Sequence, residues 1–388
     1  MLRSLYSGIS GLRSHQTMLD VTGNNIANVN TAGYKATAVQ FQDTLSQLTQ
    51  GATAPRAANG GSNPAQVGLG VLVSGISTNF SQGSAQATGR AEDLMLSGEG
   101  FFVTRQGNTS TYTRSGAFNL DGNGRLVAAD GSIVQGWTAN GDGAINTGGA
   151  LGNIVFPDGA VAPAAATNAA TMAGNLPGET LAGGTVVRDM NVYDADGAAS
   201  VVPLTFTRTE GGWSVSAPNA APVNLAFANG AQPAANAGTI TVGGVAVNLT
   251  GLTSYAGVST ASVTANGRSA GTLESFSIGK DGTLTGTFTN GAQQALARIA
   301  VATFANTSGL EKAGNSGYTA TVNSGDPVIS GAGEAGAGGI TSGMLEMSNV
   351  DLSQEFTNLI VAQRGFQANA RIITTSDEVL QELTNLKR

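Results

Sequence analysis

The sequence predicts a mixed, mainly β protein with a nested, multi-domain chain. N- and C-terminal α-helices are expected to pack as an antiparallel, coiled-coil-like pair, with two β-rich domains between them. Three observations support this class. Apolar residues recur at alternating spacings of three and four near both ends, turn dipeptides separate short Val-, Thr- and Phe-rich runs in the middle, and residues 211–267 contain no charged side chain.

The first helix is predicted directly after the N-terminus. Its stripe has the heptad spacing of a helix that packs on another helix, and Gly8 and Gly11 each cost about 1 kcal/mol relative to Ala inside a helix. This helix is therefore expected to need a partner. The predicted assembly seam on it consists of Leu2, Leu5, Ile9, Leu12, Gln16 and Leu19.

The helix is expected to end in a cluster of four asparagines, because Asn side chains compete for backbone hydrogen bonds. Gly33 follows and is predicted to take a positive φ, since the chain must turn away from the helix end there. The predicted helix-end motif is Asn24, Asn25, Asn28, Asn30 and Gly33.

A second helix is predicted at the C-terminus, where Asp351 and Glu355 near its start suit the helix dipole. Mutual packing of the two stripes is favoured over a helix that packs only on its own domain. Gln16 and Gln363 interrupt the stripes and are expected in the same or an adjacent layer. The predicted seam on this helix consists of Leu352, Phe356, Leu359, Gln363, Phe366, Ile373 and Leu380.

The chain between the helices is predicted to form strands joined by Asp-Gly and Asn-Gly turns. Two stretches rich in Gly and Ala, 159–180 and 324–343, are expected to be linkers. The predicted domains are a terminal helical domain (1–50 plus 340–388), an inner β domain (66–147 plus 271–335) and an outer β-rich insert (148–270).

Composition excludes several function classes. The net charge of −7 argues against a nucleic-acid partner. The absence of cysteine removes disulfides, thiolate metal sites and Cys nucleophiles, and the single histidine, His15, leaves little basis for a catalytic triad. No enzyme activity, catalytic residue, cofactor or metal site is expected. Neither an apolar signal-peptide core nor a run of about 18 apolar residues is found, so membrane insertion is not expected.

Three long motifs resemble the flagellar rod and hook protein family. They are SLYSGISGLRSHQTMLDVTGNNIANVNTAGYK near the start, MSNVDLSQEFTNLIVAQRGFQANARIITTSDEVLQEL near the end, and VGLGVLVSGISTNFSQGSAQATGRAEDLMLSGEGFFV with the run that follows it. The resemblance covers about residues 1–145 and 275–388. The chain departs from the usual pattern at Gly365, where relatives often carry a larger residue, so the helix is expected to be soft or closely approached there.

The resemblance implies a structural protein that polymerises into a flexible hollow tube, with the terminal helices lining its channel. The large centre favours a hook subunit that transmits torque from rod to filament. The alternatives are a distal rod subunit or a secreted β-rich binding module with an oligomerising helical stalk. Implied partners are copies of the chain itself, the distal rod protein, the hook cap and hook–filament junction proteins, and the flagellar export apparatus. The implied location is the extracellular flagellum, reached without a cleaved signal peptide. Some of the asparagines after the first helix are expected to bond neighbouring subunits.

Overall fold

The computed structural model describes residues 2–55, 60–141, 143–156, 159–227, 230 and 238–386. The chain forms two compact units. Unit 1 comprises Met1–Phe156, Ser277–Thr285 and Ala295–Arg388, and unit 2 comprises Pro157–Phe276 and Gly286–Gln294. The helical elements are α1 (Leu2–Ala27), α2 (Leu352–Asn385) and the short 3-10 helix η1 (Thr307–Gly309).

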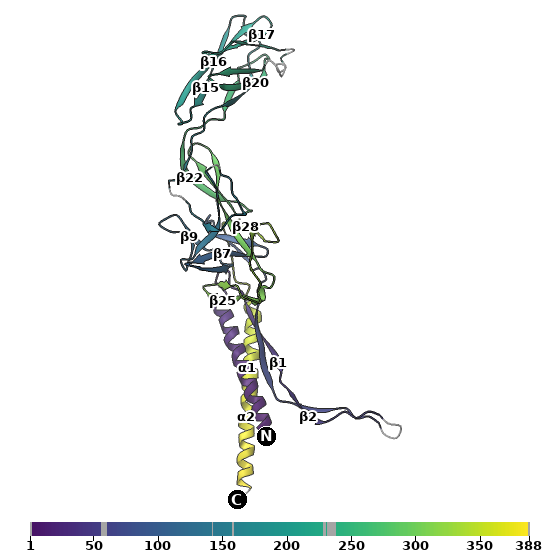
Figure 1. Cartoon of the computed structure of the whole chain (residues 1–388). Coiled ribbons are helices and arrows are strands. Elements are labelled where there is room, and N and C mark those ends of the chain that lie inside the picture. Colours follow the sequence, from purple (N-terminus) through teal and green to yellow (C-terminus); the bar gives the residue numbers. More distant parts are fainter. Residues whose placement is uncertain are drawn as a thin grey trace. The chain divides into compact units, whose positions relative to one another are not determined.

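Helices α1 and α2 lie side by side in unit 1 (Figure 1). Gly8 lies against Ile373 and His15 lies against Gly365, so the two helices run in opposite directions. This confirms the predicted antiparallel pair. Asp351 begins α2 as predicted, because its carboxylate accepts hydrogen bonds from the backbone N–H groups of Ser353 and Gln354.

Two antiparallel ribbons follow α1 in the chain. The first pairs β1 (Thr37–Asp43) with β4 (Val71–Thr78), and the second pairs β2 (Ser46–Gln50) with β3 (Ala65–Gly68). The expectation of a helical domain over 1–50 is therefore wrong beyond Ala27. On the C-terminal side, 340–388 likewise begins with strand residues, since β28 (Gly339–Ser342) pairs with β6 (Leu94–Ser97) and β29 (Met344–Glu346) pairs with β5 (Ala85–Ala87).

The main sheet of unit 1 has the strand order β24-β11-β7-β8-β26-β25. Its core contains Phe101, Tyr112, Trp137 and Tyr318, with ring contacts such as that between Phe101 and Tyr318 at 5.8 Å. The strands of this sheet and its neighbours are β7 (Phe101–Gln106), β8 (Thr109–Thr113), β9 (Phe118–Leu120), β10 (Leu126–Ala128), β11 (Ile133–Thr138), β12 (Gly152–Asn153), β24 (Gln293–Thr303), β25 (Glu311–Gly314), β26 (Gly317–Thr319) and β27 (Val328–Gly331).

Unit 2 is a sandwich of two four-stranded sheets, ordered β19-β20-β14-β21 and β15-β16-β17-β18. One shared core includes Met172, Phe206, Trp213 and Val247. The strands are β13 (Val161–Ala162), β14 (Ala169–Asn175), β15 (Thr185–Tyr193), β16 (Ala199–Thr209), β17 (Gly212–Ser216), β18 (Val223–Ala226), β19 (Thr239–Val242), β20 (Val245–Thr253) and β21 (Ser262–Ala265), together with β22 (Gly271–Ile278) and β23 (Thr283–Phe288), which run into unit 1 residues.

The insert begins later in the chain than the expected residue 148. Ile154 and Phe156 are buried in unit 1, and Ile154 N–H donates to Val134 O at 3.0 Å. Within unit 2, Ala165 and Arg268 exchange two backbone hydrogen bonds of 3.0 Å, so the incoming and outgoing chains are paired there.

The two stretches expected to be linkers contain strands instead. β14 is an inner strand of its sheet, parallel to β20, and its residues alternate between buried and exposed, with Ala170 and Met172 inward. β27 and β28 lie in the second stretch and pair with β24 and β6. Small residues hid these strands, because Ala and Gly have low strand propensity but fit where sheets pack closely.

Candidate functional site

The end of α1 is held by hydrogen bonds of the Asn25 side chain. Its Nδ2 donates to Thr37 O at 2.7 Å, and its Oδ1 accepts from Thr37 N–H at 3.0 Å and from the Tyr34 hydroxyl at 3.1 Å. Asn25 is only 1% exposed. One amide therefore ties the last turn of α1 to the first residue of β1 and to the turn between them.

The other asparagines of the motif are less buried than Asn25. Asn24 Nδ2 donates to the Tyr34 hydroxyl at 3.3 Å, and Asn28 Nδ2 donates to Asn24 O at 2.9 Å, while Asn28 Oδ1 accepts from the Thr31 hydroxyl at 3.1 Å. Asn30 is exposed, and within the described part of the chain its side chain has no hydrogen bond. That some of these asparagines bond neighbouring subunits stays a prediction, and the exposed Asn30 side chain is available for such a bond.

Gly33 has the predicted positive φ, at 69°. Its N–H donates to Glu346 O at 2.7 Å, which joins the turn after α1 to the segment before α2. A side chain at this position would collide with the backbone of Arg114 and Ser115. Glycine is therefore required both by the backbone conformation and by the close approach of another segment.

We predict that Gly33→Val strongly reduces assembly, because a β-branched residue at positive φ is strained by about 1–3 kcal/mol and also meets the backbone of Ser115. The measurement is the sedimentable fraction of the purified full chain under polymerising conditions. Gly23→Val is the matched control, since Gly23 has open space around it. Equal polymer yields from the two variants would contradict the prediction.

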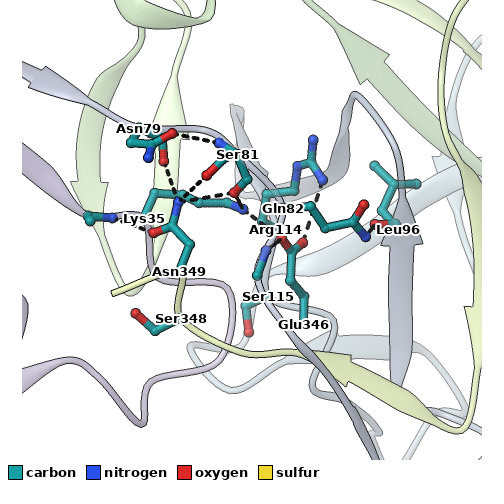
Figure 2. A network of polar contacts seen from close by, with 12 residues as sticks. Lys35, Asn79, Ser81, Gln82, Leu96, Arg114, Ser115, Glu346, Ser348 and Asn349 are labelled. Atoms are coloured by element: carbon teal, nitrogen blue, oxygen red, sulfur yellow. Dashed lines mark hydrogen bonds and ion pairs between the residues drawn. The ribbon is translucent and has the colours of Figure 1, made fainter. Parts of the chain in front are cut away.

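Lys35, Arg114 and Glu346 form a buried ionic group, here called the junction cluster (Figure 2). Lys35 Nζ lies 2.6 Å from Glu346 Oε1, and both side chains are 0% exposed. Arg114 Nη1 lies 3.5 Å from Glu346 Oε2. The Glu99 carboxylate lies 3.9 Å from Arg114 but its side chain is 74% exposed. One buried carboxylate thus lies between two buried cations.

Backbone groups complete the junction cluster. Gly83 N–H donates to Glu346 Oε1 at 2.9 Å, and Lys35 Nζ donates to Ser81 O at 2.7 Å. The neighbouring Asn349 accepts from Ala36 N–H at 2.8 Å and donates to Ser81 O at 3.1 Å (Figure 2). The segment after α1, the segment before α2 and residues 79–83 are therefore joined at one place.

Burial dominates the electrostatics of the junction cluster. It lowers the pKa of Lys35, although the hydrogen bond and charge of Glu346 act in the opposite direction. It also lowers the pKa of Arg114 and raises the pKa of Tyr318. These directions indicate a dry environment, where an uncompensated charge is expensive.

Sequence reasoning did not select Lys35, Arg114 or Glu346. Lys35 and Glu346 are 311 positions apart, so no spacing rule connects them. The available signal was indirect: charged residues are scarce in this chain, and Lys35 directly follows the turn at Gly33.

The two helices pack on each other, as expected, but the predicted seam forms only part of their contact. The seam residue Ile373 lies against Gly8, and the rest of the contact face is made mainly of small or polar residues, several of which directly precede a seam residue in the sequence. Small residues allow close approach of the two backbones, which favours this face. Buried or facing positions are Gly8, Gly11, Ser14 and Thr22 on α1 and Ala362, Gly365 and Asn369 on α2.

The other predicted seam residues lie beside this contact face. Leu2 is helical, but its side chain lies outside the described residues. Half-buried members are Leu5, Leu12, Leu19, Leu359, Ile373 and Leu380. Exposed members are Ile9, Gln16, Leu352, Phe356, Gln363 and Phe366. Their role in assembly stays a prediction, and the exposure leaves them available for it.

The two glutamines lie at nearly the same level of the helix pair, as expected. His15 lies against Gly365, which places Gln16 close to the level of Gln363. Both side chains are exposed, however, and no hydrogen bond joins them in the described part of the chain. They do not form a buried polar layer.

Glu355 in the first turn of α2 predicts a pH dependence of helix packing. Burial raises its pKa from 4.5, while hydrogen bonds with Asn25 and Thr22 act in the opposite direction. The packed state therefore holds this proton more tightly than the unpacked state, and packing weakens as pH rises through the window from 4.5 to the raised value. Glu355→Gln should stabilise the helix pair at pH 7 and reduce this dependence.

Thermal unfolding of the helices, followed by far-UV circular dichroism at pH 5 and pH 7, measures the effect. Glu382→Gln is the matched control, because Glu382 is an exposed glutamate on the same helix. The prediction is wrong if Glu355→Gln and the control show the same change between the two pH values.

The described residues offer no sign of a metal centre. No group of three or more His, Cys, Asp and Glu side chains among them is placed to hold an ion. No helix in the described ranges is both long and apolar enough to cross a membrane.

Three family models match the chain. The model for flagella basal body rod proteins matches residues 5–35, the model for the flagellar hook protein FlgE/F/G D1 domain matches residues 95–170, and the model for the C-terminal part of flagellar basal body rod FlgEFG proteins matches residues 341–386. The first match covers α1 from residue 5 onward, the last contains α2, and the middle match lies largely in unit 1.

Similar proteins extend over the whole chain. The flagellar hook protein FlgE of Borreliella burgdorferi is 40% identical, with 100% of both chains covered. FlgE of Treponema pallidum is 36% identical, and the flagellar basal-body rod protein FlgG of Bacillus subtilis is 35% identical, each also with 100% of both chains covered. The crystal structure of Helicobacter pylori flagellar hook protein FlgE2 is similar with a TM-score of 0.49 and 14% identity, covering 68% of this chain and 100% of that one.

Proposed function

This chain belongs to the flagellar hook protein family, and we propose that its copies polymerise into a flexible hollow tube that transmits torque from rod to filament. The family is structural, so the chain is a structural subunit of the bacterial flagellar hook and not an enzyme. It assembles with copies of itself and with other flagellar proteins in the flagellum. The observation that supports a polymer most directly is the set of apolar side chains that the helix pair leaves uncovered.

Those side chains lie on both helices. Ile9 is 40% exposed on α1, and Phe356, Ile360 and Val361 are each more than half exposed on α2. The two helices pack on each other mainly through small residues, so these larger residues stay largely exposed within the described chain. Exposed apolar patches of this kind mark protein–protein contacts. We propose that copies of the same helix pair cover them and that the packed helices line the channel.

The finer assignments are also proposals. We propose the distal rod protein, the hook cap, the hook–filament junction proteins and the flagellar export apparatus as partners. We further propose that the chain reaches the outside of the cell through that apparatus, without cleavage of a signal peptide. Similarity to hook proteins over the full length supports these assignments.

Phe366 also belongs to the exposed apolar residues of the helix pair, here called the uncovered stripe, and a charge at this position should impair assembly. We predict that Phe366→Asp reduces sedimentable polymer at least tenfold, because burial of an unpaired carboxylate between copies costs more than the apolar contact contributes. Ala368→Asp is the matched control, since residue 368 is exposed on the same helix and receives the same new residue. If both variants polymerise like the unaltered chain, the stripe does not carry assembly.

Electron microscopy of polymer from the purified chain tests the proposed function. A curved, flexible tube supports a hook subunit. A straight tube supports a distal rod subunit, which is the second candidate because the rod protein FlgG is 35% identical over the full length. A chain that forms no tube under any assembly condition would favour a β-rich binding module with an oligomerising stalk.

A further inference from the structure

Gly365 leaves open space on the surface of α2, and a side chain of α1 fills it. A Cβ at residue 365 would lie 2.5 Å from both Cε1 and Nε2 of His15. Real Cβ atoms do not approach other atoms so closely, so any larger residue here would displace the imidazole. The only histidine of the chain therefore packs directly on the backbone of the opposite helix.

The same arrangement occurs in reverse one turn away. A Cβ at Gly11 on α1 would lie 2.6 Å from Oδ1 of Asn369 on α2. Asn369 Nδ2 donates to Gly365 O at 2.9 Å, which holds the side chain in place along its own helix. Each helix thus presents one glycine and one polar side chain four positions apart, and the two helices exchange them.

We propose that Gly11, His15, Gly365 and Asn369 form a register lock that sets the alignment of α1 against α2. A slip of four residues would bring His15 opposite Asn369 or Val361, both of which have a Cβ where the imidazole needs open backbone. Only the observed register gives both large side chains a glycine. Glycine is less favourable than Ala inside a helix, and the fit of the lock offsets this cost.

The lock acts through shape. His15 Nδ1 is buried and has no hydrogen-bond partner in the described part of the chain. The imidazole also contacts the Phe41 ring of β1, with 5.9 Å between ring centroids. Because the His15 side chain packs against both α2 and β1, its shape can set the position of the helices without depending on one polar contact.

The register has a consequence for assembly. α2 has 34 residues and α1 has 26. With Gly8 against Ile373, the start of α1 lies near residue 378, so the last turns of α2 extend beyond it. Val379 and Leu383 on those turns are 44% and 47% exposed. The lock therefore determines how much of α2 remains for contacts outside the pair.

Disulfide reporters can test the lock, because the chain has no cysteine of its own. Ser4→Cys with Ser376→Cys continues the observed register, and Ser4→Cys with Leu380→Cys reports a slip of one turn. Oxidation of full-length polymer should close the first pair within a chain and leave the second open, since a disulfide needs Cα atoms within about 7 Å. Non-reducing electrophoresis distinguishes this intrachain bond from a dimer.

Gly365→Leu should reduce the yield of the first disulfide at least fivefold. His15→Ala together with Gly365→Leu should restore it, because the leucine then occupies the space that the imidazole leaves. Gly23→Leu is the control, since this helical glycine has open space around it and should leave the yield unchanged. The proposal is overturned if Gly365→Leu keeps the first disulfide, or if the double variant fails to restore it.

Different experimental outcomes would contradict the register lock and the proposed function. Tubes whose disulfide pattern is insensitive to Gly365→Leu would count against the lock alone. A chain that shows the expected pattern as a monomer but forms no tube would count against the proposed function alone.

Discussion

Glu346→Gln should lower the free energy of unfolding of unit 1 by about 3–5 kcal/mol, the usual cost of breaking a buried ion pair. The change removes the buried carboxylate that lies between Lys35 and Arg114 and leaves two buried cations, with only the exposed Glu99 nearby. The amide keeps nearly the same shape and an acceptor for Gly83 N–H. The loss would therefore report charge rather than packing.

Tryptophan fluorescence during denaturant unfolding can isolate unit 1. The chain has two tryptophans, Trp137 in unit 1 and Trp213 in unit 2. In a Trp213→Phe background only Trp137 reports, and it is nearly buried. Glu311→Gln, at an exposed position of the same unit, is the matched control and should change stability by less than about 0.5 kcal/mol.

A second substitution separates charge from other effects. Adding Lys35→Met to Glu346→Gln removes one of the two uncompensated cations and should recover part of the loss, which a double-mutant cycle would measure. In Glu346→Gln alone the loss should shrink as pH rises from 7 toward 10. The folded state lowers the pKa of Lys35, so the unfolded state binds more protons in that range and stability increases with pH. A loss that is absent, or that is constant with pH, would contradict this account.

Replacing residues 166–267 with a short Gly-Ser turn should leave export and polymerisation largely intact and alter the curvature or stiffness of the tube. The join is possible because Ala165 and Arg268 are already paired by two backbone hydrogen bonds. The deletion removes the shared core of unit 2 and leaves Ile154 and Phe156 in unit 1. Residues 211–267 carry no charge, so we expect contacts there that shift between copies without breaking ion pairs.

The curvature and bending stiffness of negatively stained or frozen tubes measure the effect of the deletion. The control retains unit 2 and inserts the same Gly-Ser residues at Gly243, which lies in a turn of unit 2 with open space around it. A deletion that abolishes polymerisation would show that unit 2 carries assembly. Tubes of normal curvature and stiffness would show that its uncharged faces have no mechanical role.

Several features of the fold were predictable because they depend on neighbours in the chain. Heptad spacing located both helices, and Asp351 marked the start of α2. The cluster of asparagines marked the end of α1, and Gly33 has the expected conformation because the turn there depends on local backbone sterics. The antiparallel pairing followed from two helices at opposite ends of a nested chain.

The contact face of the helix pair was not predictable from the apolar stripes. Hydrophobic periodicity detects large side chains, and α1 and α2 meet mainly through small ones. Part of the apolar stripe, including Ile9, Phe356 and Phe366, then stays exposed within the described chain. Strand β14 was not predicted for a similar reason, since most of its residues are small and Met172 is its only large apolar side chain.

Local periodicity, turn residues and composition were enough to predict the class of the protein, with two terminal helices and a mainly β centre, because each of these signals depends on residues close together in the chain. Tertiary structure alone decided which helix faces meet and which charges pair. Lys35 and Glu346 are 311 positions apart, and His15 and Gly365 are also distant in the chain. Contacts between such distant residues depend on how the whole chain packs, and no local pattern records them.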